Sequence, residues 1–261
     1  MVIPPRLSNA AIRQKYATEN LNLSGKGLEF GAYDRPMFGL NELNIQFADY
    51  YSTEELRDFA ARDGANPATI APVSHIMKKA DFAEDFPKNF DFIIASHVIE
   101  HVADTVGWLQ NMHKVLVPGG CAYFVIPDKR YTFDIVRPPS TLGQILERHI
   151  YKQNTPGFAA AFDTVYLFRG VESPKVWSGE IEPRMLTPRF DAKKAFEIAS
   201  DYYHRKDASV HTHVFTFHTF LRIIEELRNI GLISFEVLTA HDVYEPYNEF
   251  YVVLKKPEIA G

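Results

Sequence analysis

The chain of 261 residues has a single cysteine, Cys121, and no long apolar run. One cysteine excludes an internal disulfide and is typical of proteins from a reducing compartment. A membrane helix needs about 18 to 20 apolar residues, and a signal peptide needs an apolar core that the stretch Met1–Arg6 lacks. We therefore expect a cytoplasmic protein with no membrane span.

The chain also has no excess of basic residues, because it contains 28 Lys and Arg but 33 Asp and Glu, and its formal net charge is -5. A broad nucleic-acid surface needs a basic face, so we expect no nucleic-acid partner. Hydrophobic residues make up 46% and charged residues 23%, which is typical of a folded globular chain. The length suits one large α/β domain, or a core domain with an inserted cap.

Apolar segments alternate with segments of helical period through residue 126. The clearest expected strand is Phe90–Ser96, which is largely apolar and β-branched, as expected of a strand that is covered on both faces. This alternation predicts parallel βαβ units and a doubly wound sheet. The expected strands are 27–30, Leu43–Asp49, Phe90–Ser96 and Cys121–Ile126, and the expected helices are Ser8–Asn20, 53–62 and Asp104–Leu116.

Glycine is scarce where the first strand ends, because only Gly31 stands where dinucleotide-binding loops carry three glycines. A tight loop after a buried strand is nevertheless typical of a nucleotide or nucleoside site. Asp49 follows Glu29 at about the twenty-residue spacing that places a carboxylate on the two hydroxyls of a ribose. Capping of the following helix is the alternative role for Asp49.

An acidic residue followed by an aromatic one, Asp81-Phe82, comes next along the chain. The carboxylate could accept the exocyclic amine of an adenine while the ring of Phe82 covers its face. A solvated loop is the alternative interpretation of this stretch.

The motifs Leu28–Gly31, Asp49, Asp81-Phe82, 90–102 and 115–120 together resemble those of class I S-adenosylmethionine-dependent methyltransferases. The resemblance covers residues 25–137. It implies an α/β, Rossmann-like fold with a seven-stranded, mostly parallel sheet and an antiparallel last strand, here in a hairpin of Phe235–Thr239 and Glu249–Lys255. It also implies that S-adenosylmethionine lies across the carboxyl ends of the first strands. The residues expected to bind this cofactor are Glu29, Phe30, Gly31, Ala32, Asp34, Asp49, Asp81, Phe82, Ser96 and His97.

The loop departs from the usual pattern of that family, because Ala32, Tyr33 and Asp34 follow Gly31. S-adenosylmethionine has no phosphate to cradle, whereas a dinucleotide needs converging backbone amides around its pyrophosphate. The missing glycines therefore make a nicotinamide dehydrogenase a minor alternative. Asp34 could bind the ammonium group of the cofactor.

Two groups of histidines are candidates for the base that removes the proton of an acceptor hydroxyl. His97 and His101 follow the expected strand Phe90–Ser96 and would share one side of a helix. His211 and His213 would share one face of an extended segment. A structural role is the alternative for both pairs.

A metal site is a weaker alternative for the same histidines. The pair His211 and His213 could bind a metal together with Glu100 and His101. Small-RNA 2'-O-methyltransferases and ubiquinone-pathway O-methyltransferases are similar in having an acidic-x-x-Glu-His metal-binding segment. His97 stands at the acidic position here, which puts the metal in doubt. The family resemblance implies S-adenosylmethionine as the cofactor, and a divalent metal is a possible but weaker addition.

The segment between the core and the second histidine pair is long and rich in aromatic and arginine side chains. Such a segment is usually functional, and these side chains suit a sugar or a phosphorylated acceptor. A homodimer interface is the alternative. We therefore expect a cofactor-binding core (1–137), an inserted substrate or cap region (138–209) and a return to the core (210–261). The substrate-binding candidates are Arg130, Tyr131, Asp134 and Arg137.

The stretch Pro127–Asp134 further resembles a bacterial subgroup that is often associated with polysaccharide biosynthesis. The sequence thus predicts an O-methyltransferase that acts on a small polar acceptor, such as a sugar, a sugar nucleotide or a glycan precursor. A natural-product methyltransferase and a non-catalytic methyltransferase-like binding protein are the alternatives.

Overall fold

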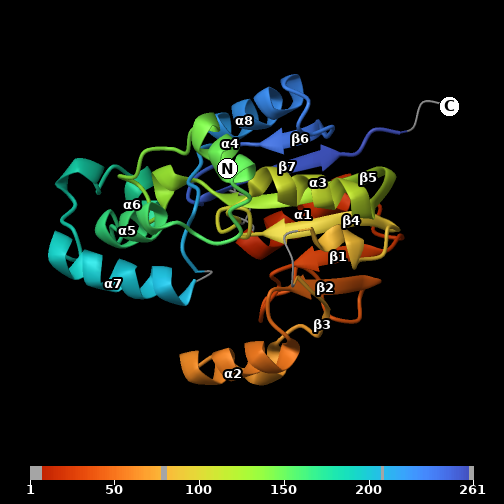
Figure 1. The fold of residues 1–261 in the computed structure, drawn as a ribbon, viewed down its shortest axis with the longest axis horizontal. Coiled ribbons are helices and arrows are strands. Elements are labelled where there is room, and N and C mark those ends of the chain that lie inside the picture. Colours follow the sequence, from red (N-terminus) through yellow and green to blue (C-terminus); the bar gives the residue numbers. More distant parts are fainter. Residues whose placement is uncertain (1–7, 78–80, 207–208, 259–261) are drawn as a thin grey trace, which may run out of the picture.

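A computed structural model describes residues 8–77, 81–206 and 209–258 and contains one seven-stranded sheet of order β3-β2-β1-β4-β5-β7-β6. All neighbouring strands pair in parallel except β7, which is antiparallel to both β5 and β6 (Figure 1). The expected Rossmann-like fold with an antiparallel last strand is therefore confirmed. The strands are β1 Gly27–Phe30, β2 Ile45–Asp49, β3 Val73–Ile76, β4 Phe90–Ser96, β5 Leu116–Pro127, β6 Glu236–His241 and β7 Glu249–Lys255.

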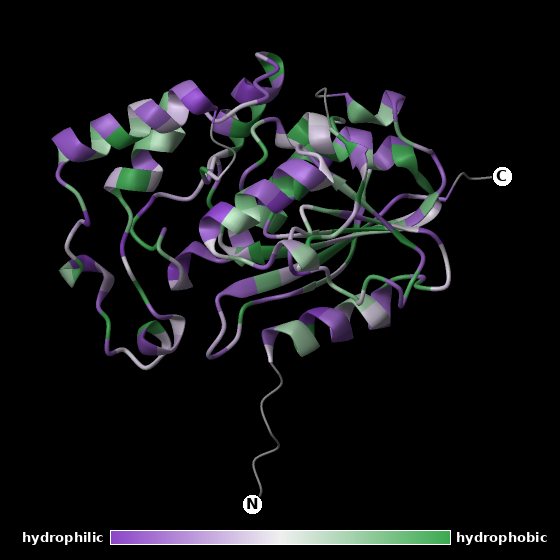
Figure 2. Cartoon of the chain, turned by 90° about the horizontal axis from the view of Figure 1, so that it is seen from below, coloured by the Kyte–Doolittle hydropathy of each residue, from purple (hydrophilic) through white to green (hydrophobic). Residues whose placement is uncertain are grey.

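Helices cover both faces of the sheet because the central strands are apolar on both faces. In β4, Ile93 and Ala95 pack into one core cluster, while Phe92 and Ile94 pack into another. Figure 2 shows the resulting pattern, with hydrophobic residues along the sheet and mixed surfaces on the helices. The helices are α1 Asn9–Asn20, α2 Thr53–Asp63, α3 Thr105–Val115, α4 Leu142–Ile150, α5 Phe158–Tyr166, α6 Ser173–Trp177, α7 Ala192–Arg205 and α8 Phe217–Asn229.

Helix boundaries agree with the capping signals in the sequence. Ser8 caps α1, and Ser52 caps α2 in a reciprocal capping box with Glu55. The helix expected over 104–116 is α3, which Asp104 caps. The Pro-Gly-Gly turn after it interrupts the ladder at the start of β5, because Leu116 pairs with Phe90 and the next pairing in register joins Cys121 to Phe92.

One expected local structure is wrong. The segment 97–103 forms bends and turns instead of a helix, and His97 has a left-handed backbone conformation with φ +54°. Since an α-helix requires negative φ, His97 and His101 do not share one helical face.

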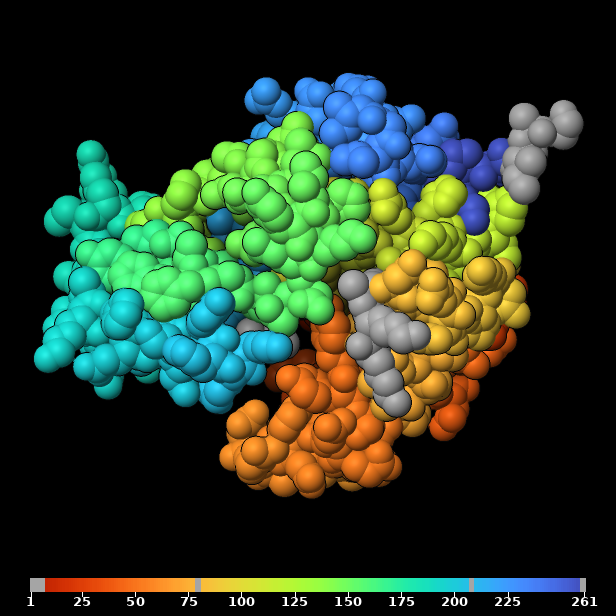
Figure 3. All heavy atoms as spheres, in the orientation of Figure 1, coloured from red at the N-terminus to blue at the C-terminus, as the bar shows by residue number. Residues whose placement is uncertain are grey.

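The helices α4 to α7 come from the chain between β5 and α8. Helices α5 and α7 pack together through a small cluster of Ala160, Ala161, Ala199 and Val210. Figures 1 and 3 show α5, α6 and α7 projecting to one side of the sheet, whereas Ile145 of α4 belongs to the main core cluster. Among the described residues, no helix is long and apolar enough to cross a membrane.

Candidate active site

The loop after β1 is held by the buried carboxylate of Glu29. Both of its oxygens accept the backbone N–H of Met37, at 2.9 and 3.2 Å. Burial raises the pKa of Glu29 to about 8, against the effect of that hydrogen bond. Gly31 has φ +63°, and a Cβ at this position would lie 2.9 Å from the Val98 side chain. The first strand therefore needs glycine at its end even though the loop holds only one.

Asp49 ends β2 next to the β1 loop, with its side chain half-buried. It accepts the backbone N–H of Tyr51 at 3.2 Å, and burial raises its pKa. Because Ser52 is the N-cap of α2, the capping alternative for Asp49 is excluded. The carboxylate of Asp49 thus lies at the carboxyl edge of the sheet, where we expect the ribose of the cofactor to bind. Asp34, in the same loop region, lies 3.7 Å from the guanidinium of its neighbour Arg35.

The expected contact of Phe82 with an adenine ring is wrong. Phe82 is 2% exposed, and its ring packs against Phe30 and Phe86 at centroid distances of 5.4 and 4.9 Å. A ring enclosed by the core has no free face for a ligand. Asp81 is accessible and forms an ion pair with Lys114 at 3.2 Å.

The end of β4 places His97 in a charged cluster that the sequence did not indicate. Its Nε2 atom lies 2.8 Å from Oε2 of the fully buried Glu249 in β7, and Arg13 of α1 binds both oxygens of that carboxylate. Burial raises the pKa of Glu249, but the hydrogen bonds from Arg13 and His97 outweigh it and lower the pKa to about 2.

Replacing Glu249 should therefore destabilise the protein in a pH-dependent way. A folded-state pKa below the usual 4.5 means that the ionised carboxylate contributes stability above pH 4.5 and loses it as the pH falls towards 2. At about 1.4 kcal/mol for each pKa unit, Glu249→Gln should lower the unfolding free energy by roughly 3 kcal/mol at pH 7. Urea unfolding at several pH values would check this. A difference from wild type that stays constant between pH 6 and pH 3 would contradict it.

The polar centre of the site comprises Glu100, His101 and His211. One potential ligand atom of each lies within 4.8 Å of the others. The rings of His101 and His211 are nearly perpendicular, with centroids 4.8 Å apart. His101 Nδ1 lies 3.2 Å from the carbonyl oxygen of Val210, and burial lowers the pKa of His101. The turn after β4 and the extended segment before α8 thus bring together residues from the two histidine groups.

Asp134 and Arg137, two of the substrate-binding candidates, hold the side chain of His211 in place. Asp134 Oδ2 lies 2.6 Å from His211 Nδ1, and Arg137 binds the other oxygen of Asp134 at 2.8 Å. Arg137 also donates to the His211 carbonyl oxygen at 3.1 Å. Since Asp134 and Arg137 are buried and occupied by these contacts, their expected role in direct substrate binding is not supported by the geometry.

The remaining candidates are occupied by other contacts, although His213 lies next to the centre and its backbone N–H donates to the Glu100 carbonyl oxygen at 2.9 Å. His213 is buried, its Nε2 atom lies 3.4 Å from the Ala103 carbonyl oxygen, and burial lowers its pKa to about 3. Arg130 pairs with Asp128 at 2.8 Å, and the ring of Tyr131 stacks on Trp177 at 4.2 Å. The last contact ties the end of β5 to α6.

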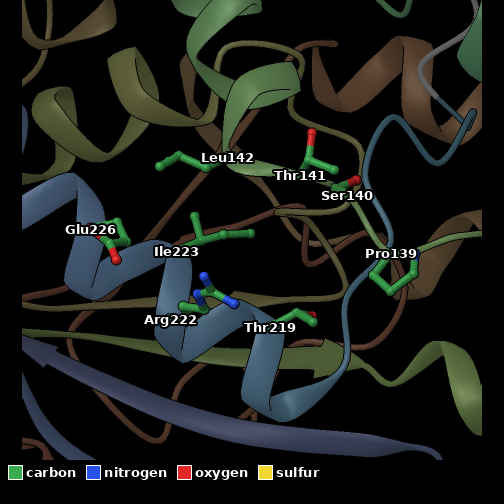
Figure 4. Close-up of a pocket in the computed structure, with 8 residues that line it drawn as sticks. All are labelled: Pro139, Ser140, Thr141, Leu142, Thr219, Arg222, Ile223 and Glu226. Carbon is green, nitrogen blue, oxygen red and sulfur yellow. The ribbon is translucent and has the colours of Figure 1, made fainter.

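A separate pocket of about 470 Å³ lies between α8 and the segment that leads into α4 (Figure 4). Arg222, Ile223 and Glu226 face it from α8, and Ser140, Thr141 and Leu142 face it from the other side. None of the residues around Glu100 lines this pocket, so its size alone does not make it the site of the chemistry.

Residues 6–179, about two thirds of the chain, match the family described as "Methyltransferase domain". The chain belongs to this family. With its seven-stranded sheet and antiparallel last strand, the protein is a class I S-adenosylmethionine-dependent methyltransferase, and S-adenosylmethionine is its cofactor. A search of curated proteins gives no significant match.

Solved structures share the fold of the methyltransferase at low identity. A Rhodobacter sphaeroides protein described as a zinc-dependent alcohol dehydrogenase is 14% identical, with 96% of this chain and 91% of that chain covered and a TM-score of 0.53. A methyltransferase from Aquifex aeolicus is 12% identical, with 94% and 89% covered and a TM-score of 0.45. The CurJ carbon methyltransferase is 14% identical, with 96% and 56% covered and a TM-score of 0.46. At 14% identity, the likeness to the Rhodobacter sphaeroides protein shows the fold alone.

Proposed function

We propose that this methyltransferase transfers the methyl group of S-adenosylmethionine to a hydroxyl of a small polar acceptor, such as a sugar, a sugar nucleotide or a glycan precursor. The observation that carries the proposal is the buried polar centre of Glu100, His101 and His211 directly after β4. A neutral hydroxyl is a weak nucleophile and must lose or share its proton during transfer, which requires polar groups at the reaction centre.

The orientation of His211 supports chemistry on a hydroxyl. Its contact with Asp134 favours a proton on Nδ1 and leaves the lone pair of Nε2 available within the centre. Asp134 in turn is held by Arg137, so the imidazole has a fixed direction. Such a fixed group aligns the acceptor with the methyl carbon more precisely than a mobile side chain does.

A polar acceptor is supported by a small pocket of about 70 Å³ beside the centre. Gln144, Arg148 and Asp163 line it together with Arg137 and His213. This volume admits one polar substituent of an acceptor, and the guanidinium group of Arg148 suits an anionic substituent such as phosphate or carboxylate. The stretch 127–134 resembles a subgroup associated with polysaccharide biosynthesis, and this resemblance favours an acceptor that contains a sugar.

Methyl transfer from labelled S-adenosylmethionine to a panel of acceptors would test the proposal. The panel needs free sugars, sugar nucleotides and sugar phosphates, with apolar phenols and polyketide-like thioesters as natural-product controls. We expect transfer to a polar hydroxyl, together with stabilisation against heat by S-adenosylhomocysteine, since a ligand that binds only the folded state raises its stability. Transfer to the apolar acceptors alone, or binding of the cofactor with no transfer, would contradict the proposed acceptor class.

A further inference from the structure

We infer that Glu100, His101 and His211 bind a divalent transition-metal ion. What the ion does for the acceptor rests on the proposed function, but its binding does not. The sequence made a metal the weaker alternative because His97 stands at an acidic position. The structure assembles three ligand atoms within 4.8 Å of one another without using His97 as a ligand.

The strongest sign of a missing partner is the carboxylate of Glu100. The residue is 1% exposed, and no described residue forms a hydrogen bond with either of its side-chain oxygens. In the described chain, His97 Nδ1 and His101 Nε2 lie 3.6 and 3.9 Å from Oε1, which is too far for a hydrogen bond. Leaving a buried carboxylate without partners costs several kcal/mol, and a bound cation would remove this cost.

Both imidazoles are fixed in the way that metal-bound histidines usually are. His101 Nδ1 faces the carbonyl oxygen of Val210 at 3.2 Å, and His211 Nδ1 faces Asp134 at 2.6 Å. A carbonyl or carboxylate acceptor places the proton on Nδ1, so both Nε2 lone pairs remain for a ligand. Backbone carbonyls and carboxylates behind histidine ligands orient the rings and increase ligand basicity.

The donor set indicates the kind of ion. Two imidazole nitrogens and one carboxylate suit Zn²⁺, Mn²⁺, Fe²⁺ or Co²⁺ better than Mg²⁺ or Ca²⁺, which prefer oxygen ligands throughout. Ligands that lie about 2.1 Å from an ion are about 3 to 4 Å apart, so small side-chain rotations would close the present arrangement. Three protein ligands leave coordination positions open for an acceptor. His213 faces the Ala103 carbonyl oxygen and is not a member of the set.

With the ion bound, His211 serves as a ligand, and the ion lowers the pKa of a coordinated acceptor hydroxyl. The acceptor oxygen then forms a bond to the methyl carbon while the carbon–sulfur bond breaks and its electron pair goes to sulfur. The products are the methyl ether and S-adenosylhomocysteine, and the hydroxyl proton passes to water. The ion thus performs the task that a general base would otherwise perform.

Calorimetric titration of the chelator-treated full chain with ZnCl₂ and, separately, MnCl₂ would test the site without cofactor or acceptor. We expect one ion for each chain. Glu100→Gln and His211→Asn should each weaken binding by about 100-fold or more, because each removes one of three ligands. Asp134→Asn should weaken it by about 10- to 100-fold, as losses of outer-shell partners do. His218→Ala removes a histidine whose side chain is 78% exposed and should change nothing.

Thermal unfolding of each variant would show whether it folds, and either ligand variant is sufficient if the other does not. A folded wild-type chain that binds neither ion, or ligand variants with unchanged affinity, would overturn the metal site. Metal binding without methyl transfer to any polar acceptor would leave the metal site in place and contradict the proposed function instead. Transfer that is equally fast before and after metal removal would overturn the role of the ion in the reaction.

Discussion

Asp49→Ala should weaken the binding of S-adenosylhomocysteine by about 100-fold. A carboxylate at the end of β2 can accept both ribose hydroxyls, and a hydrogen bond to a charged group contributes about 1.5 to 3 kcal/mol. The loss of about 3 kcal/mol corresponds to a factor of about 100 in the dissociation constant. Burial raises the pKa of Asp49 although its carboxylate accepts the backbone N–H of Tyr51, so further donors such as ribose hydroxyls would stabilise the ionised form.

Isothermal titration calorimetry would measure this change, with Asp58→Ala as the matched control. Asp58 is an exposed aspartate on α2, so its replacement removes the same charge without reaching the edge of the sheet. Equal affinities of wild type and Asp49→Ala would show that the cofactor ribose binds elsewhere. A similar loss in both variants would point to a long-range charge effect instead.

His211→Ala should lower turnover by about 100- to 10,000-fold while the affinity for S-adenosylhomocysteine changes by less than about twofold. Activation of the acceptor hydroxyl contributes on this scale, and it depends on His211 as a member of the polar centre. His211 comes from the segment before α8 and lies close to Glu100 and His101, whereas Asp49, which we expect to bind the ribose, ends β2. The two properties should therefore separate in one variant.

Initial rates at saturating cofactor, together with calorimetry on the same preparation, would check this separation. His218→Ala is the control, since it removes an exposed histidine seven residues further along the chain. Turnover of His211→Ala equal to that of the control would remove His211 from the mechanism. A parallel loss of cofactor affinity would indicate that the substitution disturbs the fold, because the buried Asp134 loses the imidazole that it contacts.

Local patterns predicted the elements of the core. The apolar residues of Phe90–Ser96 are buried on alternate faces of β4, and the capping residues Ser8, Ser52 and Asp104 start the helices where they stand in the sequence. These features depend on neighbours only a few residues away, so sequence alone can specify them. Family resemblance supplied the number of strands, the antiparallel last strand and the cofactor, which periodicity cannot provide.

Candidate residues were predicted less well when their role depended on distant neighbours. Phe82 carries the aromatic ring that an adenine site would use, but the packing of Phe30 and Phe86 around it encloses that ring in the core. Glu249 was missed because an acidic residue at the start of an apolar strand is ambiguous. An acid in such a run is the one signal that could have suggested a buried charge pair.

The sequence by itself determined the class of fold, and it supplied Gly31 and Asp49 as candidates for the cofactor site and the histidines available for chemistry. Only the tertiary structure decided how these histidines are used. Asp134 and His211 are 77 residues apart, and Glu249 meets Arg13 across 236 residues. Such pairings arise from the packing of the sheet and the segment before α8, and no local pattern encodes them. The same packing leaves Glu100 buried without a hydrogen-bond partner in the described chain, and that contact pattern turns a common Glu-His pair into a candidate metal site.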